Sequence, residues 1–528
     1  MSSLPPWLVP LADAETMRGI DRWAIEKRGV AGLELMERAG EGVARVLERL
    51  APDGPVTVLC GKGNNGGDGL VVARLLRERG RAVTVVCVAA PGELAGDAKA
   101  NLQRLPGEPP VRLDGTAWEH AGVDASVFEG SAIVVDALLG TGFQGEPRGA
   151  VAEAIDAVNR TGAPVVSVDV PSGVDASTGV VSAAAVRASV TVTFQLAKPG
   201  LWIRPGKAHA GEVQTLDIGI PRGAPQSACI GLIAPSVLAE LPRRDATSTK
   251  FSSGHVLVAG GSRGLTGAPR MAAEASMRAG AGYVTACVPA CVQSMIAAGA
   301  TPELMTRGMP DDGEALAPES VTAVLEASAR GGALALGPGL GRRAGALAFA
   351  RELAREAKVA MVLDADGLNA HAGRLADLAA RRAPTVLTPH AGELGRLLEL
   401  DSSRIERERL HHARTAAERS GAVVVLKGDD TLVTEPGGRV AVSPGAAPAL
   451  ATAGSGDVLS GVIAALLAQG LDAFTAAAAG VWLHAQAGRE AARRVGAAEA
   501  VIASDVIAAL GSARREMVFD ERVGEGLR

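Results

Sequence analysis

The stretch VTVLCGKGNNGGDGLVVARLLRERG, residues 56–80, decides the fold of the first half of this chain. A β-branched apolar run, VTVLC, passes through a glycine-rich loop into LVVARLLRERG, whose apolar residues have helical spacing. A strand, a glycine-rich turn and a helix in this order predict one unit of a parallel α/β sheet. The glycines at 61, 63 and 66 also fit the spacing G-x-G-x-x-G of dinucleotide-binding loops.

The same alternation of strand-like and helix-like runs continues along the chain in two sets. The first set has strand-like runs at 83–88, 132–139, 164–170 and 189–194, and ends near Pro221, where a stretch rich in Pro, Ser and Ala begins. The second has such runs at 255–261, 283–289, 333–339, 359–366, 384–390, 422–428 and 431–438. We therefore predict an α/β protein with two three-layer αβα domains, residues 1–221 and 222–516, and a loose tail at 517–528.

Composition excludes several classes of protein. A chain of 528 residues is too long for one hydrophobic core. The net charge of -5 and the aromatic fraction of 2% argue against a nucleic-acid or anionic-membrane partner. The longest apolar stretch, 458–483, is interrupted by Gln469 and Asp472, which predicts two buried helices rather than a membrane span. Without a signal-like N-terminus, and with five irregularly spaced cysteines, we expect a cytoplasmic protein with reduced thiols and no zinc site.

The glycine-rich loop departs from a NAD cofactor site in one respect. Such a site places Asp or Glu about 20 residues past the glycines, at the end of the second strand. Here the run at 83–88 continues into Ala-Ala-Pro, and Glu93 comes late, in a loop. The polar residues Asn64, Asn65 and Asp68 stand at the predicted helix start, where an N-cap explains only one of them. The loop therefore indicates a ligand or an ion.

Two further strand ends carry a carboxylate beside glycines. Asp136 is followed by the Gly140–Gly142 loop, and Asp169 is followed by Pro-Ser-Gly with Ser172 at its centre. Open α/β sheets bind ligands at the carboxyl ends of their strands. Three such ends in one domain predict a binding site.

The motifs NNGGDGLVVAR (64–74), DALLGTG (136–142), DVPSGVDASTG (169–179) and TFQLAKPGL (193–201) resemble the NAD(P)H-hydrate epimerase domain over residues 10–220. The resemblance implies a Rossmann-like fold that binds a hydrated dinucleotide as substrate. It implies substrate contacts from Asn64, Asn65, Gly66, Gly67, Asp68, Gly140, Thr141, Gly142, Phe143, Gln144, Gly145, Glu146 and Asp169, and a potassium ion held by Asn65, Asp136 and Ser172. Asp169, near the reacting C6, suits general acid–base catalysis.

The second half contains ATAGSGDVLSGVIAALLAQG, residues 451–470. Backbone N–H groups freed by glycines at a helix start bind anions, and Asp457 stands beside them, where it can take a proton from a hydroxyl that attacks phosphate. The alternative is an N-cap aspartate among flexible glycines. The spacing of a Walker A loop is absent.

The motifs GGSRGLTGAPRMAAEASMRAGAGYVT (260–285), GPGLG (337–341), VLDADGLN (362–369), LTPHAGEL (387–394) and VLKGDDTLV (425–433) resemble ADP/ATP-dependent NAD(P)H-hydrate dehydratase, of the ribokinase-like superfamily, over residues 225–512. The resemblance implies hydrate binding by Ala268, Gly339, His390 and Asp457, with Asp457 as the catalytic base. It implies nucleotide binding by Lys427, Gly428, Asp429, Asp430, Thr431 and Gly456, with ADP as co-substrate and Mg²⁺.

Together the two resemblances imply a homo-oligomeric repair enzyme that interconverts R and S NAD(P)H hydrates and dehydrates the S form, turning ADP into AMP and phosphate. Two alternatives stay open: a vitamin or sugar kinase with a nucleotide-sensing N-terminal domain, and a non-enzymatic role for that N-terminal domain. One departure from the dehydratase pattern is Ala446-Ala447-Pro448, where a Gly-Asn pair is expected before the proline. It puts a polar contact from that Asn in doubt.

Overall fold

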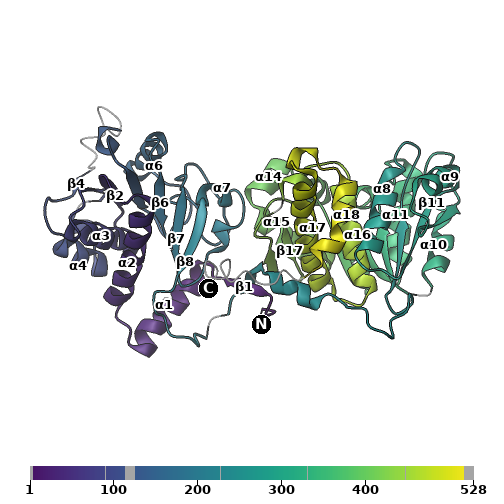
Figure 1. Cartoon of the computed structure of the whole chain (residues 1–528), viewed down its shortest axis with the longest axis horizontal. Helices are drawn as coiled ribbons and strands as arrows, with labels where there is room; N and C mark the ends of the chain where they lie inside the picture. Colours follow the sequence, from purple (N-terminus) through teal and green to yellow (C-terminus); the bar gives the residue numbers. More distant parts are fainter. Residues whose placement is uncertain are drawn as a thin grey trace. The chain divides into compact units, whose positions relative to one another are not determined.

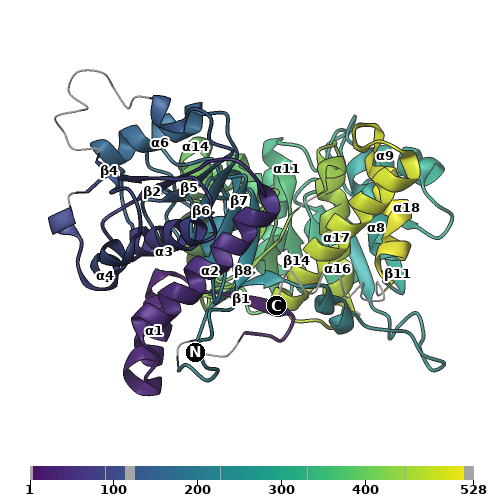
Figure 2. The ribbon, with the colours of Figure 1, turned by 60° about the vertical axis from the view of Figure 1, so that its left-hand side comes forward.

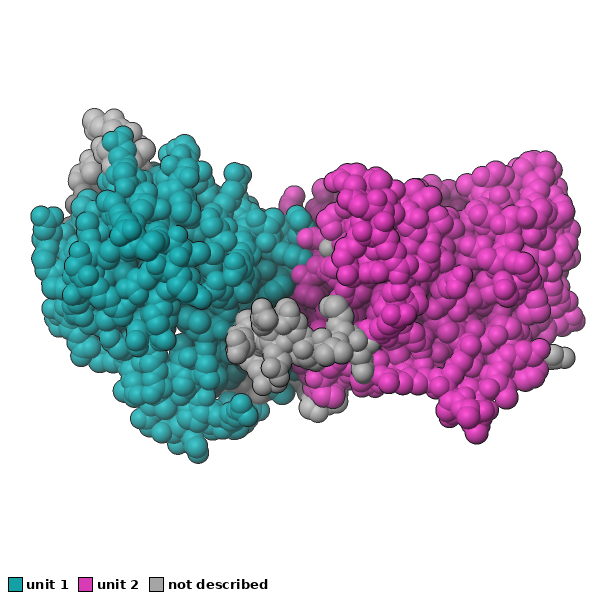
Figure 3. Space-filling view, viewed as in Figure 1, with its two compact units in different colours: residues 1–3, 10–230, 519–528 teal, residues 4–9, 231–518 magenta. Residues whose placement is uncertain are grey.

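The computed structural model describes residues 4–89, 91–112, 125–225, 227–329, 331–445 and 447–515. The chain divides into two compact units, coloured separately in Figure 3. Of the described residues, the first contains 10–230, and the second contains 4–9 together with those from 231 to 515. The boundary after residue 221 stays a prediction, and the predicted tail lies outside the described residues. The sequence analysis did not anticipate that Leu4–Val9 belong to the second unit.

The first unit is built on a parallel sheet of seven described strands, in the order β4-β3-β2-β5-β6-β7-β8 (Figure 1). The strands are β2 (Val56–Cys60), β3 (Val83–Cys87), β4 (Val111–Arg112), β5 (Ile133–Ala137), β6 (Val165–Val168), β7 (Val190–Phe194) and β8 (Glu212–Leu216). Each of the four runs predicted after β2 contains one of these strands, whereas the short β4 and the half-buried β8 were not predicted. The order changes direction at β2 and β5, which is where such sheets bind ligands.

Helices cover both faces of this sheet, because the side chains of each strand alternate between two cores. The described helices are α1 (Ala14–Arg28), α2 (Gly32–Leu50), α3 (Asn64–Glu78), α4 (Gly96–Arg104), α6 (Ala150–Arg160) and α7 (Lys207–Ala210). Val58 and Val135 pack against α2 and α3 in one core. Leu59 and Val134 pack against α6 in the other (Figure 2). The three-layer arrangement is therefore confirmed.

The second unit has a mixed sheet of eleven described strands, in the order β1-β9-β18-β17-β16-β15-β14-β13-β10-β11-β12. They are β1 (Leu8–Leu11), β9 (Ile230–Ile233), β10 (His255–Ala259), β11 (Tyr283–Pro289), β12 (Met305–Met309), β13 (Ala333–Leu336), β14 (Ala360–Leu363), β15 (Thr385–Leu387), β16 (Val423–Leu426), β17 (Leu432–Thr434) and β18 (Val440–Val442). All seven predicted runs contain a strand. Neighbouring strands in the part of the sheet between β12 and β16 pair in parallel. Strands β16, β17 and β18 pair antiparallel.

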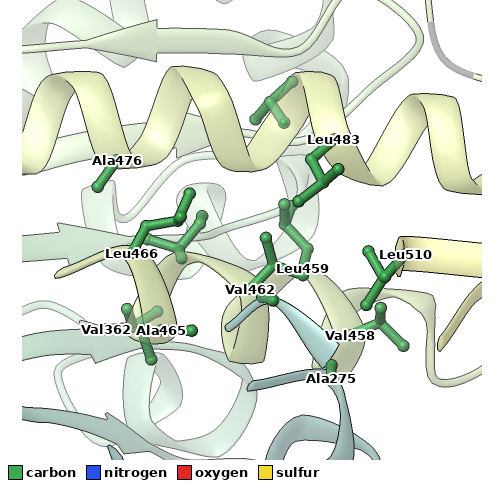
Figure 4. Close-up of a cluster of buried hydrophobic side chains, with 14 of the residues drawn as sticks. Ala275, Val362, Val458, Leu459, Val462, Ala465, Leu466, Ala476, Leu483 and Leu510 are labelled. Carbon is green, nitrogen blue, oxygen red and sulfur yellow. The ribbon is translucent and has the colours of Figure 1, made fainter. Parts of the chain in front are cut away.

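The core on one face of this sheet is formed by α8, α16, α17 and α18 (Figure 4). The helices of the second unit are α8 (Gly267–Arg278), α9 (Ala290–Gly299), α10 (Ser320–Ser328), α11 (Ala344–Glu356), α12 (Ala365–Asn369), α13 (Ala391–Leu398), α14 (Ser402–Arg407), α15 (Arg409–Ser420), α16 (Ser455–Ala468), α17 (Ala473–Val495) and α18 (Ala503–Ala513). Small residues let α8 and α16 approach closely, since a Cβ on Gly461 would lie 2.1 Å from the Ala272 carbonyl oxygen.

The apolar stretch at 458–483 forms parts of α16 and α17, as predicted. In both helices most residues are buried, and Asp472 accepts hydrogen bonds from Phe474 N and Thr475 N as the N-cap of α17. None of the described helices combines the length and the apolar composition that crossing a bilayer requires.

Residues Leu4–Val9 complete one edge of the second sheet. Trp7 is 3% exposed and its ring lies 5.8 Å from that of Phe474 on α17. The Trp7 carbonyl accepts a hydrogen bond from Ala234 N at 3.0 Å. A Cβ on Gly231 would lie 2.8 Å from Leu8 Cβ, so β9 needs glycine there for this edge strand to approach.

We predict that Trp7→Ala destabilises the second unit and leaves the first unit unchanged. Loss of a buried tryptophan costs about 3 kcal/mol, because it leaves a cavity and removes the contact with Phe474. Scanning calorimetry with limited proteolysis assigns each unfolding transition to its unit. Pro6→Ala, at an exposed position of the same segment, is the matched control. An unchanged transition for the second unit would contradict the assignment.

Candidate active sites

A cavity of about 800 Å³ opens in the first unit where β2, β5 and β6 end. The predicted substrate residues in its wall are Asn64, Asn65, Asp68, Gly140, Thr141, Gly142, Phe143 and Asp169. The predicted contacts Gly66, Gly67, Gln144, Gly145 and Glu146 do not line it. Glu93, which the sequence analysis found too late to serve as a cofactor acid, does line it.

The glycines of the first loop have a packing role that explains their spacing. A Cβ on Gly61 would lie 1.9 Å from the Leu138 carbonyl oxygen, and one on Gly66 would lie 1.9 Å from the Gly61 carbonyl oxygen. No side chain fits at either position, whereas Gly63 has open space around it. The first and third glycines therefore let the start of α3 approach the ends of β2 and β5.

Asp169 is the most constrained carboxylate in this cavity. Its φ of 69° lies in the left-handed region that non-glycine residues rarely adopt. One carboxylate oxygen lies 2.6 Å from Lys198 Nζ, and the other accepts hydrogen bonds from the Thr141 amide at 2.9 Å and from the Thr141 hydroxyl. Burial raises the pKa of Asp169, but Lys198 and Thr141 outweigh burial and hold it below its usual value. Asp169 is therefore ionised at neutral pH.

Two other carboxyl groups in the same wall have pKa values shifted the opposite way. Burial and the charge of Asp169 raise the pKa of Asp68 well above its usual value. Burial raises the pKa of Asp21 to about 6. The cavity thus combines an ionised carboxylate, a protonated carboxylic acid and the ammonium of Lys198. Groups whose pKa values are pushed apart in this way are suited to be the base and the acid of one reaction.

Sequence reasoning gave Asp68 a binding role only and missed Asp21 and Lys198. Lys198 is 1% exposed and also donates to Thr193 Oγ1 at 2.9 Å and to the Phe194 carbonyl at 3.1 Å. The sequence does contain a signal that Lys198 belongs to the site, because it is the one charged residue in the motif TFQLAKPGL. Asp21 lies in the middle of α1 and carries no such signal.

Of the predicted potassium ligands, Asn65 lines the cavity, and the Ser172 hydroxyl lies 3.4 Å from the Leu139 carbonyl that Asn65 also contacts. Asp136 is 0% exposed and accepts hydrogen bonds from the Ser172 amide, the Ser172 hydroxyl and the Ser167 hydroxyl, at 2.9, 2.5 and 2.8 Å. Asn65 donates from Nδ2 to the Leu139 carbonyl at 2.9 Å, and its buried Oδ1 has no partner among the described residues. Burial raises the pKa of Asp136 despite its hydrogen bonds. The cluster offers oxygen atoms and no cationic side chain.

In the second unit a cavity of about 500 Å³ lies beside the start of α16. Its wall contains the predicted nucleotide residues Lys427, Gly428, Asp429, Thr431 and Gly456. The predicted contact Asp430 is absent from the wall because its carboxylate, 0% exposed, lies 3.0 Å from Arg409 Nε in a buried ion pair. Ala447 lines the cavity and is buried, and Ala446 lies outside the described residues.

Lys427 joins this cavity to a group of carboxylates. Its Nζ lies 3.1 Å from Asp364 and 3.7 Å from Glu393, and Asp364 also accepts a hydrogen bond from the Ser460 hydroxyl at 2.7 Å. Burial lowers the pKa of Lys427, but Asp364 and Glu393 outweigh burial and raise it. Burial and the charge of Asp364 raise the pKa of Asp457 to about 7. A carboxyl group with a pKa near the working pH is well suited to general base catalysis.

The predicted hydrate-binding residues of this unit, Asp457 included, do not line the cavity. His390 is the N-cap of α13, accepting from Gly392 N at 3.0 Å through Nδ1, and its exposed Nε2 lies 3.6 Å from Glu393. His390 therefore caps α13, and it also lies next to Glu393, which is one of the carboxylates around Lys427. Gly339, with φ 63°, lies against Ala268, since a Cβ there would be 3.2 Å from the Ala268 Cβ.

These features define a class of protein: an α/β enzyme with one active site in each half, each at the carboxyl ends of parallel strands. Residues 32–200 match the family described as "YjeF-related protein N-terminus", and residues 256–510 match "NAD(P)H-hydrate dehydratase". The chain is 41% identical over 508 residues to the bifunctional NAD(P)H-hydrate repair enzyme of Moorella thermoacetica, covering 94% of this chain and 95% of that one. It is 41% identical over 544 residues to that of Salinibacter ruber, covering 98% of each.

The chain belongs to the family of bifunctional NAD(P)H-hydrate repair enzymes, with an epimerase domain followed by a dehydratase domain. The function predicted from the two resemblances is thereby confirmed, and the kinase alternative is set aside. Among solved structures, an ADP/ATP-dependent NAD(P)H-hydrate dehydratase from Bacillus subtilis, co-crystallized with ATP/Mg²⁺, is 28% identical and covers 52% of this chain and 94% of its own, with a TM-score of 0.46.

We predict that Asp457→Asn stabilises the second unit above pH 7 but not below pH 4. The pKa of Asp457 is raised to about 7, well above the ordinary value of an aspartate, so the folded state retains a proton that the unfolded state has lost. Stability therefore falls as pH rises between these values, and the substitution removes that loss. Urea unfolding at several pH values measures the difference. Asp377→Asn, at an exposed site, is the control, and equal gains at all pH values would contradict the raised pKa.

Proposed function

We propose that Asp457 is the base of the dehydration, acting on a hydrate bound beside Lys427 and the start of α16. Its carboxylate takes the proton of the C6 hydroxyl as that oxygen attacks the terminal phosphorus of ADP. The bond from that phosphorus to AMP breaks and a phosphate ester forms at C6. The ring nitrogen lone pair then expels phosphate, and loss of a proton from C5 restores NAD(P)H. The observation that carries this proposal is the Asp457 pKa of about 7 next to an anion-binding helix start.

The nucleotide site in this proposal is the 500 Å³ cavity lined by Lys427, Thr431 and Gly456. A Cβ on Gly456 would lie 3.5 Å from Lys427 Nζ, so this lysine stands directly beside the glycine. Its ammonium can therefore bind phosphate oxygens together with backbone amides of the first turn of α16. Magnesium would bind chiefly through phosphate oxygens and water, since it seldom uses an all-protein cage, and would neutralise charge on the phosphates. ATP in place of ADP would give ADP as product.

For the epimerisation we propose Asp169 and Asp68 as the pair that moves protons at C6. Breaking a bond at C6 needs a proton on the departing atom, and remaking it on the other face needs a proton taken from the entering atom. Asp68 is the protonated partner and Asp169 the ionised one, in line with their opposite pKa shifts. Lys198 keeps Asp169 ionised.

Asn65, Asp136 and Ser172 would hold a potassium ion. Hard oxygen ligands suit such a cation. The unpartnered Asn65 Oδ1 and the fully buried Asp136 carboxylate both fit it, because a cation would supply the missing partner and offset the buried charge. When bound, it would help order the Leu138–Gly140 loop, whose Leu139 amide donates to the Ser172 hydroxyl at 2.9 Å. We also propose that the enzyme is a homo-oligomer, as the family resemblance implies.

Separating the two activities tests the assignment of the two sites. Asp457→Ala is expected to lower the dehydration rate by a factor of about 10² to 10⁴ and to leave epimerisation unchanged, and Asp169→Ala should do the reverse. The assay follows recovery of NADH absorbance from mixed R and S hydrates with ADP. In the Asp169→Ala variant, the S hydrate should be converted to NADH rapidly. The R hydrate should be converted only at the rate of spontaneous epimerisation. Rapid full recovery by Asp169→Ala would rule out Asp169, and normal dehydration by Asp457→Ala would rule out Asp457.

Exchange of K⁺ for a bulky organic cation tests the cation site. The epimerisation rate of the wild-type protein should fall and the thermal unfolding midpoint of the first unit should drop, while dehydration is unchanged. Asp136→Asn should be insensitive to the exchange on both readouts, because the charge that holds the ion is gone. The site would be contradicted if neither the epimerisation rate nor the thermal unfolding midpoint of the first unit of the wild-type protein changed when K⁺ was exchanged.

A further inference from the structure

His484 is a buried polar side chain in the wall of the nucleotide cavity, and nothing above gives it a task. It lies on α17 with Val481 and Ala485, which line the same cavity. His484 is 7% exposed, and its Nε2 has no hydrogen-bond partner among the described residues. Leaving such a group without a partner costs more than its burial returns, so a buried orphan of this kind calls for a ligand.

The position of α17 is fixed by contacts in the turn that follows His484. One turn later, Gly488 lets the helix touch the cavity rim, since a Cβ there would lie 2.8 Å from Leu450 and 3.0 Å from Ala447. The Arg489 side chain donates to the Gly445 carbonyl at 2.6 Å. The imidazole is therefore held by a rigid helix rather than by a loop.

The hydrogen bonding of the ring decides what Nε2 can do. The backbone of Ser455 raises the pKa of the ring, which is the effect of a carbonyl acceptor close to one of its nitrogens. The Ser455 amide already donates to the Thr452 carbonyl at 3.4 Å. Since Nε2 has no partner, the nitrogen that faces Ser455 is Nδ1, and it carries the proton of the neutral ring. Nε2 is then a bare acceptor.

The ring stays neutral at physiological pH. Burial, followed by the charge of Lys427, lowers the pKa of His484 to about 4. His484 therefore brings no positive charge to the phosphates, and an acceptor cannot bind phosphate oxygens, which lack hydrogens when ionised. The partner must be a donor on the nucleotide. An adenosine nucleotide has two kinds, the ribose hydroxyls and the exocyclic amine of adenine.

We propose that His484 accepts a hydrogen bond from a ribose hydroxyl of the nucleotide and so makes the dehydratase half selective for ribonucleotides over deoxyribonucleotides. The phosphate end of the site is at Lys427 and Gly456, and His484 contacts Ser455, the residue next to Gly456. The ribose is the part of the nucleotide adjoining the phosphates, whereas the adenine amine lies farther away. The inference rests on the nucleotide site proposed above.

The test compares ADP, 2′-deoxy-ADP, 3′-deoxy-ADP and inosine diphosphate, which lacks the amine, as phosphate donors for dehydration. For the wild-type protein, KM should rise about tenfold for one deoxy analogue and stay unchanged for inosine diphosphate. His484→Leu should show that same rise with ADP itself and no further rise with the deoxy analogue. His484→Gln, whose side-chain oxygen can accept in place of Nε2, should restore part of the difference.

Val481→Ala is the matched control, because it alters the cavity wall on the same helix without a polar group, and it should keep the preference for ADP. Thermal unfolding of each variant confirms that the second unit is folded. A wild-type protein that does not saturate with ADP contradicts the proposed nucleotide site itself. If the wild-type protein saturates with ADP and has the same KM for both deoxy analogues as for ADP, the nucleotide site stands and only the proposed role of His484 is wrong. If KM is higher for inosine diphosphate than for ADP in the wild-type protein, and this difference disappears in His484→Leu, then His484 binds the adenine amine and the proposed ribose contact is wrong.

Discussion

Each half of this enzyme depends on a largely buried lysine held against carboxylates at the end of a parallel sheet. Lys198 pairs with Asp169, and Lys427 lies between Asp364 and Glu393. Burial raises the pKa values of Asp68 and Asp457, whereas Lys198 lowers the pKa of Asp169 and Lys427 lowers that of Asp457. Removing one partner of such a pair leaves an uncompensated buried charge, at a cost of about 3–5 kcal/mol, so the ion pairs also constrain the loops that carry them. The acid–base properties of both sites follow from this arrangement.

The sequence was sufficient for the central strands of both sheets and for several of the residues that line the two cavities, but not for the outer strands or for all of the lining residues. Asp136 and Asp169 could be predicted because parallel strands end at one edge, so carboxylates at strand ends must meet. Asp364 was missed as a partner of Lys427 because the two are joined only by the strand order of the folded sheet. Shifted pKa values depend on burial, which a motif does not contain. Asp68 and Asp169 both stand in glycine-containing motifs, and their opposite pKa shifts come from burial at Asp68 and from Lys198 and Thr141 at Asp169.

Neighbouring residues in one motif can also have different roles. In VLKGDDTLV the motif predicts nucleotide contacts at both Asp429 and Asp430, yet only Asp429 reaches the cavity, because Arg409 binds the carboxylate of Asp430. Where the family pattern has Gly-Asn before Pro448, the described residue Ala447 is 3% exposed. Its Cβ would lie 3.0 Å from a Cβ on Gly488, so this part of the cavity rim makes an apolar contact with α17.

The edge strand at Leu4–Val9 has a consequence for synthesis of the chain. It leaves the ribosome before the whole first unit, while its neighbour β9 begins only at Ile230. At elongation rates of about 5–20 residues per second it waits roughly ten to forty seconds for that partner. During this time an apolar segment with Trp7 is unpaired and can associate with other nascent chains. Pro5 and Pro6 lie within it and Pro10 follows it, and because proline has no backbone N–H to donate, they limit such pairing until the correct neighbour emerges.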